Sequence, residues 1–143
     1  MGGWFSRELG DKGLLDLGEA LRRLVHLRTL KIDFLCQNTN FTDQGLSHLS
    51  KGLEQLKYLE EISLRCGEAL KVTDKGLKIL GQGLEGLVLL QNVQLNLWSL
   101  EKITDLAGQN FCQGLKNLPN LKEFDLQVER SLNFSGAGLY LLC

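Results

Sequence analysis

The chain has 143 residues, 16 basic and 17 acidic side chains for a formal net charge of −1, and 43% hydrophobic residues. This length suits one domain with a buried core, and the composition is that of a folded protein rather than a disordered one. A near-neutral balance gives no electrostatic reason to expect nucleic acid or an anionic membrane as the main partner. No apolar run approaches the ~20 residues of a membrane span.

The first residues, MGGWFS at 1–6, fit the M-G-x-x-x-[ST] pattern of N-myristoylation, which would modify Gly2. A single acyl chain would give only marginal, reversible membrane binding. The alternative interpretation is that Trp4 and Phe5 cover the open end of the first helix. Both interpretations stay open at this point.

A repeated unit accounts for nearly all of the remaining chain. The stretches "FTDQGLSHLSKGLEQLKYLEEISL", "VTDKGLKILGQGLEGLVLLQNVQL" and "ITDLAGQNFCQGLKNLPNLKEFDL" begin at Phe41, Val72 and Ile103, which are 31 residues apart. "LGDKGLLDLGEALRRLVHLRTLKI" from Leu9 is the same unit 32 residues before Phe41, and "FSGAGL" from Phe134 begins another. A fixed period is typical of stacked repeats. We therefore expect a single domain over 1–143, with four near-complete repeats and a truncated fifth.

Each unit is predicted to hold a helix and then a strand. The leucines of the first half recur at +3, +4, +3, which is one face of a helix; they are Leu46, Leu49, Leu53 and Leu56 in the second unit. Threonine occupies the N-cap position, and the aspartate after it favours the positive end of the helix dipole. The second half alternates apolar and polar residues, which predicts short strands with one buried face at 62–66, 93–97 and 124–128.

The stretch 81–86, GQGLEG, spells the G-x-G-x-x-G of a nucleotide-binding turn. That turn requires a strand before it and a helix starting on it, whereas this stretch falls within a predicted helix. Gly81 and Gly86 do not recur as glycine in the other units, so we interpret the motif as a coincidence. Two other small positions do recur, and we expect stacked helices to approach closely there. Gly83 recurs as Gly52 and Gly114, with Ala20 in the first unit, and Gly76 recurs as Gly13 and Gly45, with Ala107 in the fourth.

The pattern L-x-x-L-x-L, a loop, and then [VIF]-T-D-x-G-L-x-x-L-x-x-G-L resembles the leucine-rich repeat superfamily over residues 9–142. It is most similar to ribonuclease-inhibitor-like repeats and to the I-T-D-x-G-L repeats of protist and F-box-associated proteins. The resemblance implies an α/β fold, a leucine-rich-repeat solenoid that coils right-handedly with parallel strands on the concave face and helices on the convex face.

The chain departs from that family in three ways. The family places Asn or Cys after the strand, where this chain has Leu35, Gly67, Trp98 and Glu129, so its loops must be held differently. The period exceeds the usual ~20–29 residues. In the fourth unit Gly108 replaces a helix leucine, and we expect that helix to be locally looser.

No catalytic, cofactor or metal site is predicted. His26 and His48 have no carboxylate or cysteine partner at a repeated spacing, which a nucleophile or metal site would need. None of the four cysteines forms a C-x-x-C pair, which favours reduced thiols in a cytosolic compartment. Cys66 and Cys112 are expected in the core, and Cys36 and Cys143 are the more exposed thiols.

The candidate binding surface consists of strand side chains that point away from the core. Stacking places Asp33 beside Arg65, an exposed ion pair of little value for stability. Trp98 at a strand exit is either an interface anchor or folds into its loop. Leu139 and Leu142, on the core stripe of the last unit, offer an apolar edge for docking at that end. The candidate partner-binding residues are Lys31, Asp33, Ser63, Arg65, Gln94, Asn96, Trp98, Asp125 and Gln127.

We therefore expect a non-catalytic scaffold that binds another protein through the concave strands. The alternative is a structural subunit of a cytoskeletal or ciliary assembly docked through its open ends, a role that the protist-type resemblance suggests. An enzyme-inhibitor role is disfavoured, because four repeats form a shallow arc and the acidic patch is thin. We expect a cytoplasmic protein with no nucleic-acid partner and no stable membrane insertion; the alternative function would place it within such an assembly.

Overall fold

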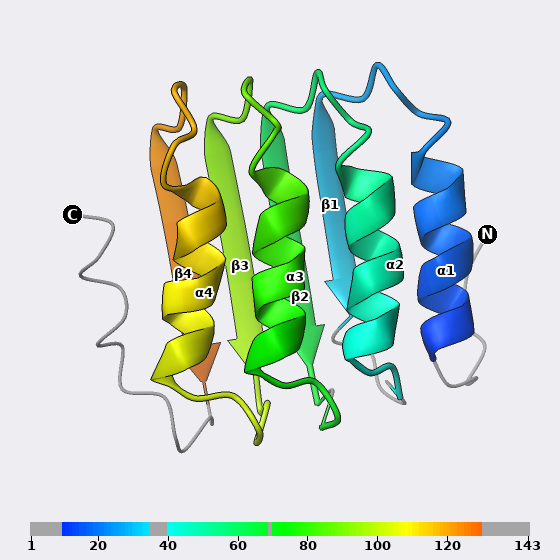
Figure 1. Ribbon diagram of the computed structural model, residues 1–143, viewed down its shortest axis with the longest axis vertical. Coiled ribbons are helices and arrows are strands. Elements are labelled where there is room, and N and C mark those ends of the chain that lie inside the picture. The colour runs from blue at the N-terminus through cyan, green and yellow to red at the C-terminus, as the bar shows by residue number, and fades with distance from the viewer. Residues whose placement is uncertain (1–9, 35–39, 69, 130–143) are drawn as a thin grey trace.

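The computed structural model describes residues 10–34, 40–68 and 70–129. In this part of the chain four helices alternate with four strands in two layers, and the helices cover one face of a parallel sheet (Figure 1). The strands follow chain order, β1-β2-β3-β4, as the α/β prediction requires. The elements are α1 Asp11–Leu21, β1 Thr29–Phe34, α2 Asp43–Leu53, β2 Glu61–Gly67, α3 Asp74–Leu84, β3 Asn92–Trp98, α4 Asp105–Leu115 and β4 Glu123–Glu129.

Threonine is the N-cap residue of three of the helices, as predicted. The Oγ1 atom of Thr42 accepts a hydrogen bond from the Gln44 amide at 3.1 Å, and Thr73 and Thr104 cap α3 and α4 in the same way. Such a cap satisfies one of the backbone amides that the first helical turn leaves without a partner. The first described helix, α1, follows Gly10 and has no side-chain cap.

The aspartate in the first turn of α1, α2 and α3 links neighbouring units, which the sequence interpretation missed. Asp11 Oδ1 accepts from the backbone amide of Thr42 at 2.7 Å, and its Oδ2 accepts from Thr42 Oγ1 at 2.8 Å. Charge-assisted bonds of this kind are short and strong. We call this arrangement the capping joint; it recurs as Asp43 with Thr73 and as Asp74 with Thr104.

The recurring glycines lie where neighbouring helices touch, as predicted. A Cβ atom on Gly45 would lie 2.5 Å from Asp11 Oδ1, and one on Gly76 would collide with the Asp43 carboxylate. A Cβ on Gly52 would lie 2.5 Å from the Gly18 carbonyl oxygen. Gly81 faces Gly114 of the next helix, inside α3, so 81–86 does not form a strand-to-helix turn.

The core lies between the two layers. Cys66 pairs in register with Phe34 and Leu97 and is 7% exposed, and Cys112 is 2% exposed, as predicted for both. The helix that contains Gly108 keeps the same 11-residue length as the others. Its Phe111 is stacked on Phe124 with ring centroids 5.7 Å apart. Phe111 takes the place that Leu80 has in the preceding unit, and a small apolar cavity remains beside Gly108.

Backbone geometry holds the loops at the ends of β2 and β3. Glu68 and Ser99, the residues after these strands, have φ angles of 55° and 59°. Their amides donate to the carbonyl oxygens of Trp98 at 2.9 Å and Glu129 at 2.8 Å, one strand further along. The left-handed residue therefore turns the chain out of the sheet while its amide continues the ladder, which needs no Asn or Cys side chain. The equivalent Cys36, and Leu35 before it, lie outside the described residues.

Candidate binding site on the open face of the sheet

The parallel register brings the predicted strand residues together in rows. Lys31, Ser63, Gln94 and Asp125 form one row across the four strands. Asp33, Arg65, Asn96 and Gln127 form the next. Every member is exposed or half-exposed, because the helices cover only the other side (Figure 1). We call this surface the open face; its outward residues are Thr29, Lys31, Asp33, Glu61, Ser63, Arg65, Asn92, Gln94, Asn96, Trp98, Glu123, Asp125, Gln127 and Glu129.

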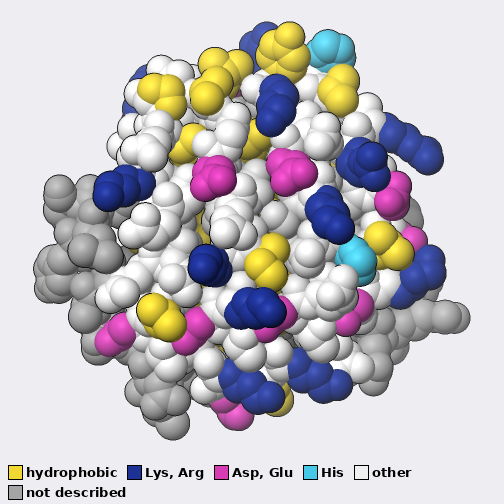
Figure 2. All heavy atoms as spheres, in the orientation of Figure 1, with side chains coloured by type: hydrophobic (Ala, Val, Ile, Leu, Met, Phe, Trp, Pro, Cys, Tyr) yellow, Lys and Arg dark blue, Asp and Glu magenta, His cyan; other side chains and the backbone are white. Residues whose placement is uncertain are grey.

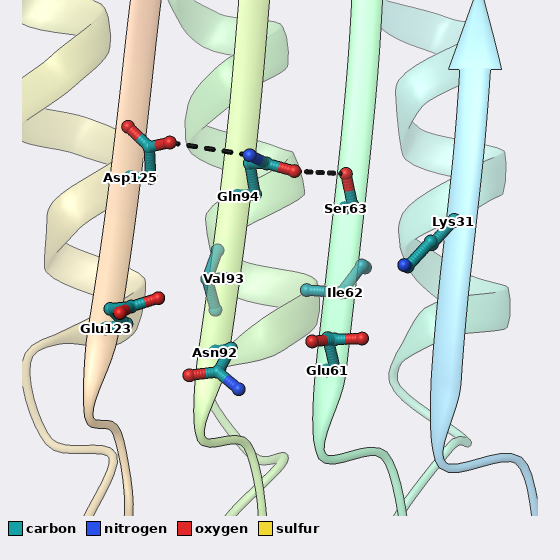
Figure 3. A pocket seen from close by; sticks show the side chains of 9 residues that line it. All are labelled: Lys31, Glu61, Ile62, Ser63, Asn92, Val93, Gln94, Glu123 and Asp125. Atoms are coloured by element: carbon teal, nitrogen blue, oxygen red, sulfur yellow. Dashed lines mark hydrogen bonds between the residues drawn. The ribbon is translucent and has the colours of Figure 1, made fainter.

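A chain of side-chain hydrogen bonds crosses the open face and converges on Asp125. Ser63 Oγ donates to Gln94 Oε1 at 2.8 Å, and Gln94 Nε2 donates to Asp125 Oδ2 at 3.4 Å (Figure 3). From the second row, Asn96 Nδ2 donates to Gln127 Oε1 at 3.1 Å and Gln127 Nε2 donates to Asp125 Oδ2 at 3.2 Å. Exposed bonds of this kind add little to stability, but they orient the amides that a partner would meet.

The predicted ion pair is present on the same face. Arg65 Nη1 lies 3.2 Å from Asp33 Oδ2, and the two side chains are 48% and 49% exposed. At this exposure the pair contributes little free energy to folding. Its consequence is electrostatic, because the two opposite charges cancel on the open face between β1 and β2.

The face is hollowed between the four strands. The hollow has a volume of about 180 Å³, and three carboxylates line it: Glu61, Glu123 and Asp125, with Lys31 reaching in from β1 (Figure 3). Small-molecule sites usually enclose ~300–1,000 Å³ with mostly apolar walls. This shallow polar hollow is better suited to one polar side chain of a protein partner. Its other lining residues are Ile62, Ser63, Asn92, Val93 and Gln94.

Trp98 is the last residue of β3, where it pairs with Gly67 and Glu129 and is half-buried. It is therefore a strand residue at the rim of the open face, next to the left-handed turn at Ser99. The other predicted positions, Leu139 and Leu142 for end docking and Gly2 for lipidation, lie outside the described residues.

Within the described part of the chain, the two cysteines are buried thiols and His26 packs against an aromatic ring. Burial raises the pKa of Cys66 to about 12 and that of Cys112 to about 11, so neither is a thiolate at neutral pH. His26 is packed against Tyr58, with ring centroids 5.5 Å apart. No group of three or more potential metal ligands occurs among the described residues.

A comparison with protein-family models and with curated proteins finds no match to this chain. Within 10–34, 40–68 and 70–129, no helix is long and apolar enough to cross a bilayer.

Proposed function

We propose that this chain is a non-catalytic leucine-rich-repeat solenoid that binds another protein through the open face, which would be the concave side of the coil. The observation that carries the proposal is the polar chain from Ser63 and Asn96 to Asp125. It fixes the side chains of three strands in one surface before any partner arrives. A partner that meets pre-oriented groups loses less conformational entropy on binding.

The anchors of this interface would be Trp98 and Arg65 at the rim and the hollow beside Asp125. Trp and Arg are the residue types that most often carry binding energy at interfaces. The hollow would take one polar or basic side chain of the partner against its carboxylates. Glu61 and Glu123 line this hollow from strands on either side of β3.

The test is a quantitative affinity capture from native lysate with the full chain. The open-face variant carries Arg65→Glu, Asn96→Lys and Trp98→Ala. A matched control carries Lys78→Glu and Gln82→Lys, both exposed on α3. We expect one partner to be captured by the intact chain and the control and lost from the open-face variant. Equal capture by all three proteins would refute the open face as the binding surface.

A second candidate function is a structural subunit that assembles through its ends. The observation in its favour is the burial of the outer strands. Leu30 of β1 and Leu126 of β4 are only partly buried, whereas Leu64 and Leu95 of the inner strands are 4% and 1% exposed. Light scattering across a concentration series separates the candidates: an end-docking subunit self-associates, whereas a recognition module stays monomeric.

A further inference from the structure

The turns between each helix and the following strand form a row along one edge of the molecule, the upper edge in Figure 1. Three of them are closed by a backbone bond: Leu27 N to Leu24 O at 3.0 Å, Leu59 N to Leu56 O at 3.0 Å, and Leu90 N to Leu87 O at 3.0 Å. The two central residues of every turn are exposed. We call these central residues the tip row: Val25, His26, Lys57, Tyr58, Val88, Leu89, Pro119 and Asn120.

The composition of the first three turns of the tip row is unusual, whereas the fourth has the typical turn residues Pro119 and Asn120. Central turn positions favour Pro, Asp, Asn, Gly and Ser, which suit the backbone and water. Here Val25 is 42% exposed, Tyr58 50%, Val88 51% and Leu89 37%, and Leu24 beside them is 50% exposed. Hydrophobic side chains gather along this upper edge in Figure 2. Each keeps between about a third and a half of its surface exposed. A row of such apolar side chains along one edge is a candidate interaction site.

The tip row is held in place by contacts between neighbouring turns. The rings of His26 and Tyr58 join the first two turns, with centroids 5.5 Å apart. Asn120 Nδ2 donates to the Val88 carbonyl oxygen at 2.8 Å and joins the last two. The leucines beneath the second and third turns are fully buried at 0% exposure. The apolar tips are therefore presented in a fixed line, and binding would not have to order them.

The charge around the tip row is positive. The turn segments 22–28, 54–60, 85–91 and 116–122 hold six basic and three acidic residues, a formal net charge of +3 in a chain whose total is −1. None of the tip residues is acidic; Glu54 and Glu85 are helix C-caps. The open face has the opposite sign, with two basic and five acidic residues. The basic residues of the turns are Arg22, Arg23, Arg28, Lys57, Lys116 and Lys122.

We propose that the tip row docks reversibly on an anionic lipid surface. Protruding aliphatic tips can enter the boundary between headgroups and acyl chains, where the amphipathic Tyr58 and Lys57 keep their polar ends in water. The flanking arginines and lysines would meet lipid phosphates, each adding to the attraction. The near-neutral total charge conceals this site, because the positive charge is confined to one edge.

The observations favour lipid over a protein as the occupant. The tips are single side chains that protrude from separate turns, which suits a surface that yields around each of them. Docking through this edge would leave the open face free, since the sheet face does not coincide with the turn edge (Figure 1). The inference therefore stands independently of the protein-binding function proposed above.

The test is vesicle flotation with the full chain, produced without N-myristoylation so that Gly2 carries no lipid. We expect the protein to float with phosphatidylcholine vesicles that contain phosphatidylserine, to remain unbound with phosphatidylcholine alone, and to dissociate as salt rises. Val88→Asp with Leu89→Asp should abolish flotation. Arg23→Glu with Arg28→Glu should weaken partitioning at least about tenfold.

The matched control is Lys51→Glu with Lys78→Glu, which makes the same change in net charge on the exposed sides of α2 and α3. It should retain nearly all binding. No flotation of the intact chain at low salt would overturn the proposal. So would equal losses in the control and the Arg23/Arg28 variant, because general charge would then explain the binding. Loss of a protein complex from the tip variants with vesicle binding unchanged would assign the edge to a protein partner instead.

Discussion

The two edges of the molecule differ in which of their residues recur from unit to unit. At the edge where helices begin, three successive joints use the same aspartate and threonine, and the small residue beside them is Gly45, Gly76 and then Ala107. At the edge where helices end, only the leucines beneath the turns recur, and the tip residues differ from unit to unit. A position that recurs in every unit serves the stacking that all units share. A position that varies on the same backbone is free to serve binding, and four predictions test this division.

The largest effect is expected from one glycine at the helix-start edge. In Gly76→Ala the new methyl group would overlap the Asp43 carboxylate, which Thr73 holds in place, and would also press on Leu46. We expect a loss of about 2 kcal/mol in the free energy of unfolding, measured with urea, because the overlap is partly offset by the higher helix propensity of alanine. Gly86→Ala is the matched control at the other edge, where the nearest atom to the new methyl is Lys57 Nζ at 3.6 Å.

Gly86→Ala should change the free energy of unfolding by less than about 0.5 kcal/mol. If both glycine variants were equally stable, the close contact at the joint would carry no energy, and the first edge would have no special role in stability.

The second prediction removes the carboxylate itself. Asp43→Ala deletes both acceptors of the Thr73 amide and hydroxyl and leaves a partly buried amide without its partner. We expect a loss of about 2 kcal/mol in thermal or urea unfolding. Asp16→Ala breaks only an exposed ion pair with Lys12 and should cost less than about 0.5 kcal/mol. Equal losses in the two variants would contradict the capping joint.

The third prediction concerns pH and the first joint. Burial raises the pKa of Asp11, but the hydrogen bonds from Thr42 outweigh it, so the pKa is lowered from its ordinary value of 3.8. A carboxyl with a depressed pKa in the folded state stabilises the protein above its unfolded pKa. That contribution is lost as the pH falls through the folded value. The stability difference between the natural chain and Asp11→Asn should therefore be full near pH 7 and shrink below about pH 4.

The matched measurement uses Asp16→Asn, whose difference from the natural chain should stay small at every pH. An Asp11→Asn difference that is constant from neutral to acid pH would mean that the carboxylate charge plays no part in the joint. The loss would then come only from the shape of the side chain.

Much of the fold could be predicted because its signals are local. The leucine spacing located the helices, and alternation located the strands: 93–97 was predicted and Asn92–Trp98 is found. The Asp33–Arg65 pair followed from register alone. The capping joint was missed because the aspartate was interpreted only as a favourable charge at its own helix. Its threonine partner lies in the next unit and becomes apparent only when the units are stacked.

The tip row could not be predicted from periodicity. In the stretch 87–90, four apolar residues follow one another, so alternation does not reveal which of them are buried. The turn geometry determines which of them are buried. Leu87 and Leu90 are joined by the backbone hydrogen bond that closes the turn and are buried, while Val88 and Leu89 protrude. The residue types recur only in part, as Val25 and Val88, and this weak recurrence was the one signal in the sequence.

The smallest effect is expected at the tip row, and it is the sharpest test of the comparison between the two edges. Val88→Ser with Leu89→Ser removes two large apolar groups that are 51% and 37% exposed in the folded state. Because these groups stay partly exposed, the free energy of unfolding should change by at most about 1 kcal/mol for each residue. The matched variant Leu87→Ala, beneath the same turn at 0% exposure, should lose ~2–5 kcal/mol.

A large loss in the serine variant would mean that the tips support the fold, and their exposure would then need no binding partner to explain it. A small loss means that the chain retains exposed valine and leucine at this turn with little benefit to its stability. Exposed apolar groups favour aggregation, so they are unfavourable unless something covers them. Measured together with vesicle flotation of the same serine variant, the result separates residues that maintain the stack from residues that the stack presents.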